Sequence, residues 1–146
     1  MVLAVVVLAA DQASKLAVTS AFVPREPHPV IPGIVDLTYV TNTGGAFGLM
    51  PWATPALAVV AGLVAVALMV YGPRLMAAGR IFEVASALLL GGALGNLIDR
   101  ARLGHVIDFV DLHFWPVFNI ADIGITVGAI LFVIAVLAGS RKQHEE

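Results

Sequence analysis

Residues 91–100 read Gly91-Gly92-Ala93-Leu94-Gly95-Asn96-Leu97-Ile98-Asp99-Arg100. An apolar segment ends here in an amide, a carboxylate and a guanidinium, and more polar residues follow before the next apolar segment begins at residue 120. Ionisable groups within or beside membrane-length segments are costly and are retained mainly where they serve a function. The region from residue 91 to residue 122 is therefore the first place to expect a functional site.

The composition indicates a membrane protein. Of the 146 residues, 60% are hydrophobic and 12% are charged, with a mean hydropathy of +0.96, whereas a soluble domain is roughly 25% charged. The absence of cysteine excludes disulfides, thiolate metal ligands and a cysteine nucleophile. No run of basic residues suits nucleic acid. The length favours a single polytopic membrane domain over residues 1–146.

Four segments are apolar over the length of about 20 residues that a membrane-spanning helix needs. They lie at about residues 2–21, 53–71, 81–98 and 120–138. Trp52 and Trp115 fall near the ends of spans, where interfacial aromatic residues are expected. The pattern predicts an all-α membrane protein with four transmembrane helices.

Basic residues predict the orientation of these spans. Those on the side of the two termini are Arg74, Arg80, Arg141 and Lys142. Because basic residues are enriched in cytoplasmic loops, we expect both termini in the cytoplasm and the segment 22–52 outside. Arg100 and Arg102 fall on the outer side and count against this orientation, but Arg100 lies in the polar cluster, where the site explains it.

The segment 22–52 predicts a small extracytoplasmic β-rich platform between the first two helices. Its prolines exclude a helix. Residues 34–41 are rich in β-branched and aromatic side chains, which is typical of a strand. Residues 42–48 then turn the chain back toward the membrane.

Several polar residues share helix faces in the spans. Asp11 and Lys15 are four residues apart, and we expect a self-neutralising pair that pins the first helix to its neighbours, with the Lys15 ammonium extending outward. Asn96 shares a face with Asp99 and Arg100, and the latter two are expected to form an ion pair at the helix end. Glycines spaced four apart in spans three and four predict close helix packing.

The remaining chemistry is that of paired carboxylates. Two aspartates held together share a proton, so that one activates a water while the other protonates a carbonyl oxygen. His105 and His113 lack the spacing of a known metal motif, so no metal is predicted. Spacing alone does not choose the pair from four candidates, which are Asp99, Asp108, Asp111 and Asp122.

Two other functions fit the composition less well. A small transporter or proton-conducting protein would use the carboxylates as a relay, but such a path needs polar groups through the whole depth of the membrane, and the inner halves of the spans are almost wholly apolar. A structural helix-packing subunit would explain the glycines and leave the outer carboxylates without a purpose.

Four motifs in this order resemble those of the bacterial lipoprotein signal peptidases, or signal peptidase II, an aspartyl peptidase family. The resemblance covers about residues 11–128, and Gly45 stands where the family usually has alanine. The motifs are Asp11-Gln12-Ala13-Ser14-Lys15, Asn42-Thr43-Gly44-Gly45-Ala46-Phe47, Gly95-Asn96-Leu97-Ile98-Asp99-Arg100 with Gly104-His105-Val106-Ile107-Asp108-Phe109, and Phe118-Asn119-Ile120-Ala121-Asp122.

The resemblance implies roles for individual residues. Asp108 and Asp122 would be the catalytic pair. Four residues would line the site and hold the substrate, namely Asn42, Asn96, Arg100 and Asn119. Asp11, Lys15 and Asp99 would be structural. Asp111 matches no strong position of the family and receives no role.

The resemblance also implies the reaction and its location. The substrate would be a diacylglyceryl-modified prolipoprotein, cut just before the lipidated cysteine without a metal or other cofactor. The site would lie near the outer leaflet of the bacterial cytoplasmic (inner) membrane, in contact with membrane lipid, and residues 42–48 would cover the bound peptide. The cyclic peptide globomycin targets this family. Nothing in the sequence argues for an oligomer, so we expect a monomer.

Overall fold

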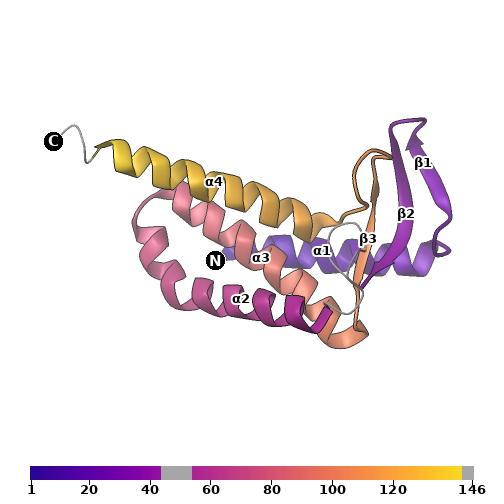
Figure 1. Ribbon diagram of the computed structural model, residues 1–146, viewed down its shortest axis with the longest axis horizontal. Helices are drawn as coiled ribbons and strands as arrows, with labels where there is room; N and C mark the ends of the chain where they lie inside the picture. Colours follow the sequence, from indigo (N-terminus) through magenta and orange to yellow (C-terminus); the bar gives the residue numbers. More distant parts are fainter. Residues whose placement is uncertain (44–53, 143–146) are drawn as a thin grey trace.

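The computed structural model describes residues 1–43 and 54–142. This part of the chain contains four helices, each long and apolar enough to cross a membrane, and a small antiparallel sheet (Figure 1). The elements are α1 (Val2–Ala21), β1 (Pro27–Ile31), β2 (Val35–Asn42), α2 (Thr54–Ala77), α3 (Arg80–Leu103), β3 (Val106–Asp111) and α4 (Ile120–Lys142). The predicted fold class is confirmed.

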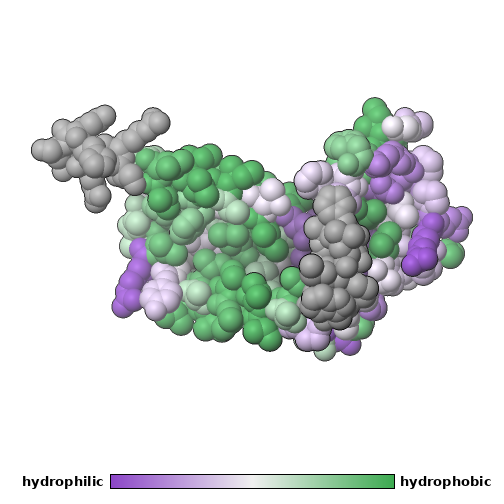
Figure 2. All heavy atoms as spheres, viewed as in Figure 1, coloured by the Kyte–Doolittle hydropathy of each residue, from purple (hydrophilic) through white to green (hydrophobic). Residues whose placement is uncertain are grey.

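Helix α3 is the centre of the bundle and packs against α1, α2 and α4. Half of its membrane-length window is buried, compared with 11% for α2. The outer faces of α2 and α4 expose large apolar side chains, and Figure 2 shows this apolar surface over the helices and more hydrophilic residues over the sheet. The bundle therefore presents to a bilayer the surface that a water-soluble bundle would bury.

Small residues allow α3 and α4 to pack closely, as the glycine spacing predicts. A Cβ atom on Gly92 would collide with the backbone carbonyl of Ala121 and would lie 2.9 Å from Cγ1 of Ile125. A Cβ atom on Gly128 would lie 3.0 Å from the carbonyl oxygen of Ala85. Two of these contacts are with backbone carbonyl oxygens, which cannot move aside as the end of a flexible side chain could, so the glycines set the distance between the two helices.

The sheet lies across one end of the bundle with the strand order β1-β2-β3 (Figure 1). The strand predicted at residues 34–41 is present as β2. Strand β3 comes from the connection between α3 and α4 and was not predicted, although Val106, Ile107, Phe109 and Val110 are typical strand residues. The platform therefore joins two distant parts of the chain.

Three helices extend beyond their predicted ends, and one of them is α4, which continues past Ala138 to Lys142. Helix α2 continues past Tyr71 and through Pro73 to Ala77. Helix α3 continues to Leu103 and ends at Gly104, whose φ of 74° is the left-handed conformation that glycine adopts without strain. Asn96, Asp99 and Arg100 consequently lie within the last turns of a regular helix. The predicted cover at 42–48, with Gly45, and Trp52 fall almost wholly outside the described residues.

We expect Gly92→Ala to lower the thermal unfolding midpoint in detergent, because the added methyl group forces α3 and α4 apart; overpacking of this kind costs roughly 1–3 kcal/mol. Gly62→Ala is the matched control, since its Cβ atom would meet only Cδ2 of Leu97 at 4.0 Å. Equal midpoints for the two variants would contradict the packing argument.

Candidate active site

The predicted polar residues come together where α1, α3 and α4 meet the sheet. At the centre is Lys15, whose side chain is 2% exposed. Its Nζ atom lies 2.9 Å from Oδ2 of Asp11 and 2.7 Å from Oδ2 of Asp99, and it donates to Oδ1 of Asn96 at 3.0 Å. The expectation that Lys15 extends outward is therefore wrong, and its carboxylate partners hold it inside the bundle. Asp99 pairs with Lys15 instead of the predicted Arg100.

The two carboxylates of this cluster also bind backbone groups of other elements. Oδ1 of Asp11 accepts the backbone N–H of Ala121, in the first turn of α4, at 2.9 Å. Oδ2 of Asp99 accepts the backbone N–H of Ile107, in β3, at 3.2 Å. A free N–H at a helix N-terminus is favourably bound by an anion. The cluster thus ties α1, α3, β3 and α4 to one point.

Asn119 and Asp122 form a reciprocal cap at the start of α4. Oδ1 of Asn119 accepts the backbone N–H of Asp122 at 2.9 Å, and Oδ2 of Asp122 accepts the backbone N–H of Asn119 at 3.3 Å. This is the capping-box arrangement, in which two free N–H groups are satisfied at once. The other oxygen of Asp122, Oδ1, accepts Nδ2 of Asn96 at 2.8 Å. The cap fixes the position of the Asp122 carboxylate relative to α3.

Asp108 is 2% exposed and is held by two amides. Nδ2 of Asn42 donates to its Oδ2 at 2.9 Å, and Nδ2 of Asn119 donates to its Oδ1 at 2.7 Å. Burial raises the pKa of Asp108 to about 6, against the opposing effect of the Asn42 hydrogen bond and with a further increase from the charge of Asp122. Asn119 therefore contacts the carboxylates of both Asp108 and Asp122 and holds them as a pair.

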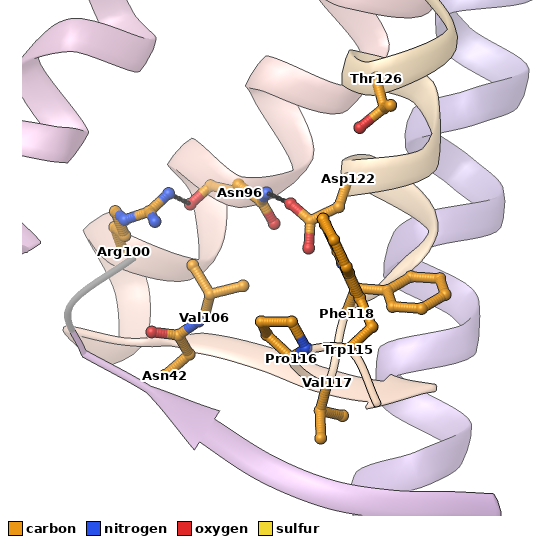
Figure 3. A pocket seen from close by; sticks show the side chains of 10 residues that line it. All are labelled: Asn42, Asn96, Arg100, Val106, Trp115, Pro116, Val117, Phe118, Asp122 and Thr126. Atoms are coloured by element: carbon orange, nitrogen blue, oxygen red, sulfur yellow. Dashed lines mark hydrogen bonds between the residues drawn. The ribbon is translucent and has the colours of Figure 1, made fainter. Parts of the chain in front are cut away.

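A cavity of about 260 Å³ opens beside this pair (Figure 3). Asp122 faces it, with Asn42, Asn96 and Arg100 around the polar side, and Nη1 of Arg100 donates to the carbonyl oxygen of Asn96 at 3.5 Å. Asp108 lies beneath Asn42 and is absent from the lining. The opposite wall consists of Trp115, Pro116, Val117 and Phe118.

Sequence reasoning missed this wall, apart from placing Trp115 at a membrane interface. The wall belongs to the connection between β3 and α4, which leaves the sheet at Asp111 and returns at Phe118. There the backbone N–H of Val110 donates to the carbonyl oxygen of Phe118 at 2.8 Å, and the N–H of Phe118 donates back at 3.1 Å. The strand pattern at residues 106–110 could have predicted this loop, because a strand there requires a turn before α4 begins.

Two apolar cavities flank the carboxylate of Asp122. One of about 320 Å³ lies between the 112–118 connection and α4, and another of about 280 Å³ lies between α2, α3 and α4. Asp122 lines both. The site therefore combines the carboxylate of Asp122 with two surfaces on which apolar chains can lie.

The remaining candidates lie elsewhere. Asp111 is bound by the hydroxyl of Thr38 at 3.4 Å and by the backbone N–H of His113 at 2.8 Å, away from Asp108 and Asp122. Among residues 1–43 and 54–142, no group of three or more histidines and carboxylates is arranged to hold a metal ion. Of the four candidate carboxylates, the geometry thus brings together Asp108 and Asp122.

Comparisons with known proteins agree on one family. The family model described as signal peptidase (SPase) II matches residues 3–138. The lipoprotein signal peptidase of Moorella thermoacetica is 44% identical over all of this chain and 97% of its own, and that of Syntrophomonas wolfei is 47% identical over 92% of this chain and 89% of its own. A solved structure of a bacterial membrane enzyme at 2.3 Å resolution matches with a TM-score of 0.89 and 32% identity, covering 99% of this chain and 91% of its own.

We expect Lys15→Ala to lower the thermal unfolding midpoint strongly, because it leaves Asp11 and Asp99 buried without their cation. Breaking a buried ion pair in this way costs roughly 3–5 kcal/mol. Ser14→Ala is the control, since the Ser14 hydroxyl donates only within α1, to the carbonyl oxygen of Asp11. A Lys15→Ala midpoint equal to that of Ser14→Ala would show that the cluster does not stabilise the bundle.

The raised pKa of Asp108 predicts a pH dependence of stability. The folded protein binds this proton more tightly than the unfolded chain, so the free energy of unfolding falls as the pH rises from about 4 to about 6 and is then constant. The shift from 3.8 to about 6 corresponds to a contribution on the order of 3 kcal/mol. Asp108→Asn should remove this fall in unfolding midpoints measured between about pH 4 and about pH 8. Parallel curves for the variant and the unchanged protein would exclude Asp108 as the titrating group.

Proposed function

The chain belongs to the signal peptidase II family, and on that premise we propose that it removes the signal peptide of diacylglyceryl-modified prolipoproteins. The cut falls just before the lipidated cysteine and frees the amino group of that residue. Asp108 and Asp122 are the catalytic pair. The observation that supports this assignment most is Asn119, which donates to Oδ1 of Asp108 through its amide and to Oδ2 of Asp122 through its backbone N–H.

The environments of the two carboxyl groups suit a shared proton. Asp108 holds it, because burial raises its pKa to about 6 and so lets its carboxyl group keep a proton at a pH where an ordinary aspartate is ionised. Asp122 faces the cavity and acts as the base. It takes a proton from a water, whose oxygen attacks the scissile carbonyl carbon, while Asp108 gives its proton to the carbonyl oxygen. When the tetrahedral intermediate collapses, the amine leaves with the proton held by Asp122, and Asp108 regains its own.

The polar side chains around the cavity hold the peptide. Asn42 covers Asp108 and must move for the substrate carbonyl to reach that carboxyl group, after which its amide is available to the peptide backbone. Arg100 lies at the mouth with its guanidinium half-buried, in a position to bind a peptide carbonyl oxygen. Asn96 and Asn119 hold the carboxylates in place through the hydrogen bonds described above.

The location of the site suits a lipid-linked substrate. The sheet end of the bundle is the outer side when both termini are cytoplasmic, so the bond is cut near the outer leaflet of the bacterial cytoplasmic membrane. The apolar cavities beside Asp122 allow apolar parts of the substrate to remain in contact with membrane lipid while the peptide bond is cut. The enzyme works as a monomer without a metal or other cofactor.

The test is a gel-shift cleavage assay on a prolipoprotein with and without its diacylglyceryl group, with a chelator present throughout. We expect cleavage of the lipidated form only, and no cleavage by Asp108→Asn or Asp122→Asn protein that remains folded in detergent. Asp111→Asn is the matched control from the same strand and should retain a turnover number within about threefold of the unchanged protein.

Near-normal turnover by either Asp108→Asn or Asp122→Asn would exclude the assigned pair. Loss of cleavage on chelation would exclude a metal-independent mechanism. If folded protein cleaves neither substrate, proton flux in liposomes becomes the next measurement, and flux lost in Asp122→Asn would support a proton-conducting protein instead.

A further inference from the structure

Two carboxylates face each other across the sheet and are not used by the proposed mechanism. Asp36 of β2 is the direct partner of Asp111 of β3 in the antiparallel register. Asp36 is 7% exposed, so its charge is poorly screened by water. Like charges at directly opposed positions destabilise a sheet, and a nearby cation relieves this.

His113 reaches both carboxylates from the loop that follows β3. Its Nε2 atom lies 3.5 Å from Oδ2 of Asp36, and its backbone N–H donates to Oδ1 of Asp111 at 2.8 Å. The imidazole thus contacts the carboxylate of β2, while the backbone of the same residue is held by the carboxylate of β3.

The backbone at His113 is strained in a way that these contacts maintain. Its φ of 65° is in the left-handed region, which a residue with a Cβ atom seldom adopts. The next residue closes a tight turn, in which the N–H of Phe114 donates to the carbonyl oxygen of Leu112 at 2.8 Å. Strain of this kind persists where the surroundings hold it and is common beside functional sites.

This turn fixes one wall of the site. The loop of residues 112–116 continues from His113 directly into Trp115 and Pro116, which face Asp122 across the cavity (Figure 3). Phe114 and Trp115 are 81% and 60% exposed, so packing alone does not hold them. The ends of the connection are hydrogen-bonded to β3 at Val110. His113 adds two further ties to the sheet, one through its side chain to Asp36 and one through its backbone N–H to Asp111.

We propose that His113 is a positioning residue, whose imidazole ties the loop of residues 112–116 to Asp36 and thereby sets the position of the Trp115–Pro116 wall for substrate binding. Loss of this contact frees the turn, and the wall no longer presents one shape to the peptide. The effect falls on substrate binding and not on the bond-breaking step, because His113 touches neither Asp108 nor Asp122. Only this kinetic effect rests on the proposed function.

Trp115 offers a test that needs no substrate. The chain has two tryptophans, so Trp52→Phe leaves Trp115 as the single fluorophore in the loop. In this background we expect His113→Gln to shift the emission maximum of Trp115, because the freed turn changes the surroundings of the indole. His113→Lys should keep the emission maximum of the unchanged protein, since an ammonium group can also pair with Asp36. His28→Gln, on the same sheet, should leave the maximum where it is.

The kinetic prediction follows from the size of a half-exposed ion pair. We expect His113→Gln to raise KM for the lipidated prolipoprotein about threefold at about pH 6, with kcat within about twofold, and His113→Lys to restore KM. Asp36→Asn tests the same contact from the other side, and the effects of the two substitutions should not add when combined.

An emission maximum of Trp115 that is the same in His113→Gln as in the unchanged protein, or a shift that His113→Lys does not reverse, would overturn the proposal. So would additive effects of Asp36→Asn and His113→Gln. A shift that follows His113 in protein that cleaves no prolipoprotein would support the positioning role and refute the proposed function. Cleavage without any shift would do the reverse.

Discussion

The structure depends on one buried cation. Moving an ammonium group out of water into a bundle interior is costly unless anions and hydrogen-bond acceptors surround it. Lys15 has two carboxylates and an amide oxygen within 3.0 Å. Those carboxylates in turn bind the N–H groups of Ala121 and Ile107. Lys15 and Asp11 belong to α1 and Asp99 to α3, while the two N–H groups belong to α4 and β3. The polar groups of the cluster are therefore all satisfied only when these four elements are in place. The polar cluster therefore specifies how the apolar helices, which have little preference among lipid-like surfaces, pack against one another.

The same cluster determines how Asp108 and Asp122, the proposed catalytic pair, are held. Oδ1 of Asn96 faces Lys15, so its Nδ2 is left to donate to Asp122. Asn119 is oriented by the cap of α4, so its Nδ2 is left to donate to Asp108. Neutral amides thus bind the carboxylates of Asp108 and Asp122, and the side chain of Asn96 lies between the Lys15 ammonium and Asp122. A direct ion pair with Lys15 would favour the ionised form, whereas amides position a carboxyl group and leave burial free to raise the pKa of Asp108.

Much of this architecture could be predicted from local patterns. The four apolar spans, the strand at 34–41 and the close packing at the glycines depend on periodicity and composition within one segment. The capping box at Asn119 and Asp122 is also a local pattern and was overlooked. The inward position of Lys15 and the pairing of β3 with β2 could not be predicted in this way. Hydropathy does not tell whether a lysine extends to the interface or finds two carboxylates, and the partner of a strand depends on segments more than sixty residues apart, as Asn42 and Val106 are.

Strand β3 connects the two halves of the site because its side chains alternate between two faces. Asp108 points to the face shared with Asn42, where the proposed catalytic pair lies, and Asp111, three residues on, points to the face shared with Asp36 and His113. The backbone that positions the Asp108 carboxyl group therefore also anchors the loop that forms one wall of the cavity. Phe118 pairs with Val110 on this strand, and Asn119, the next residue, binds both members of the pair. A shift of β3 by one residue would exchange its two faces, so the register with β2 determines both the chemistry and the shape of the site.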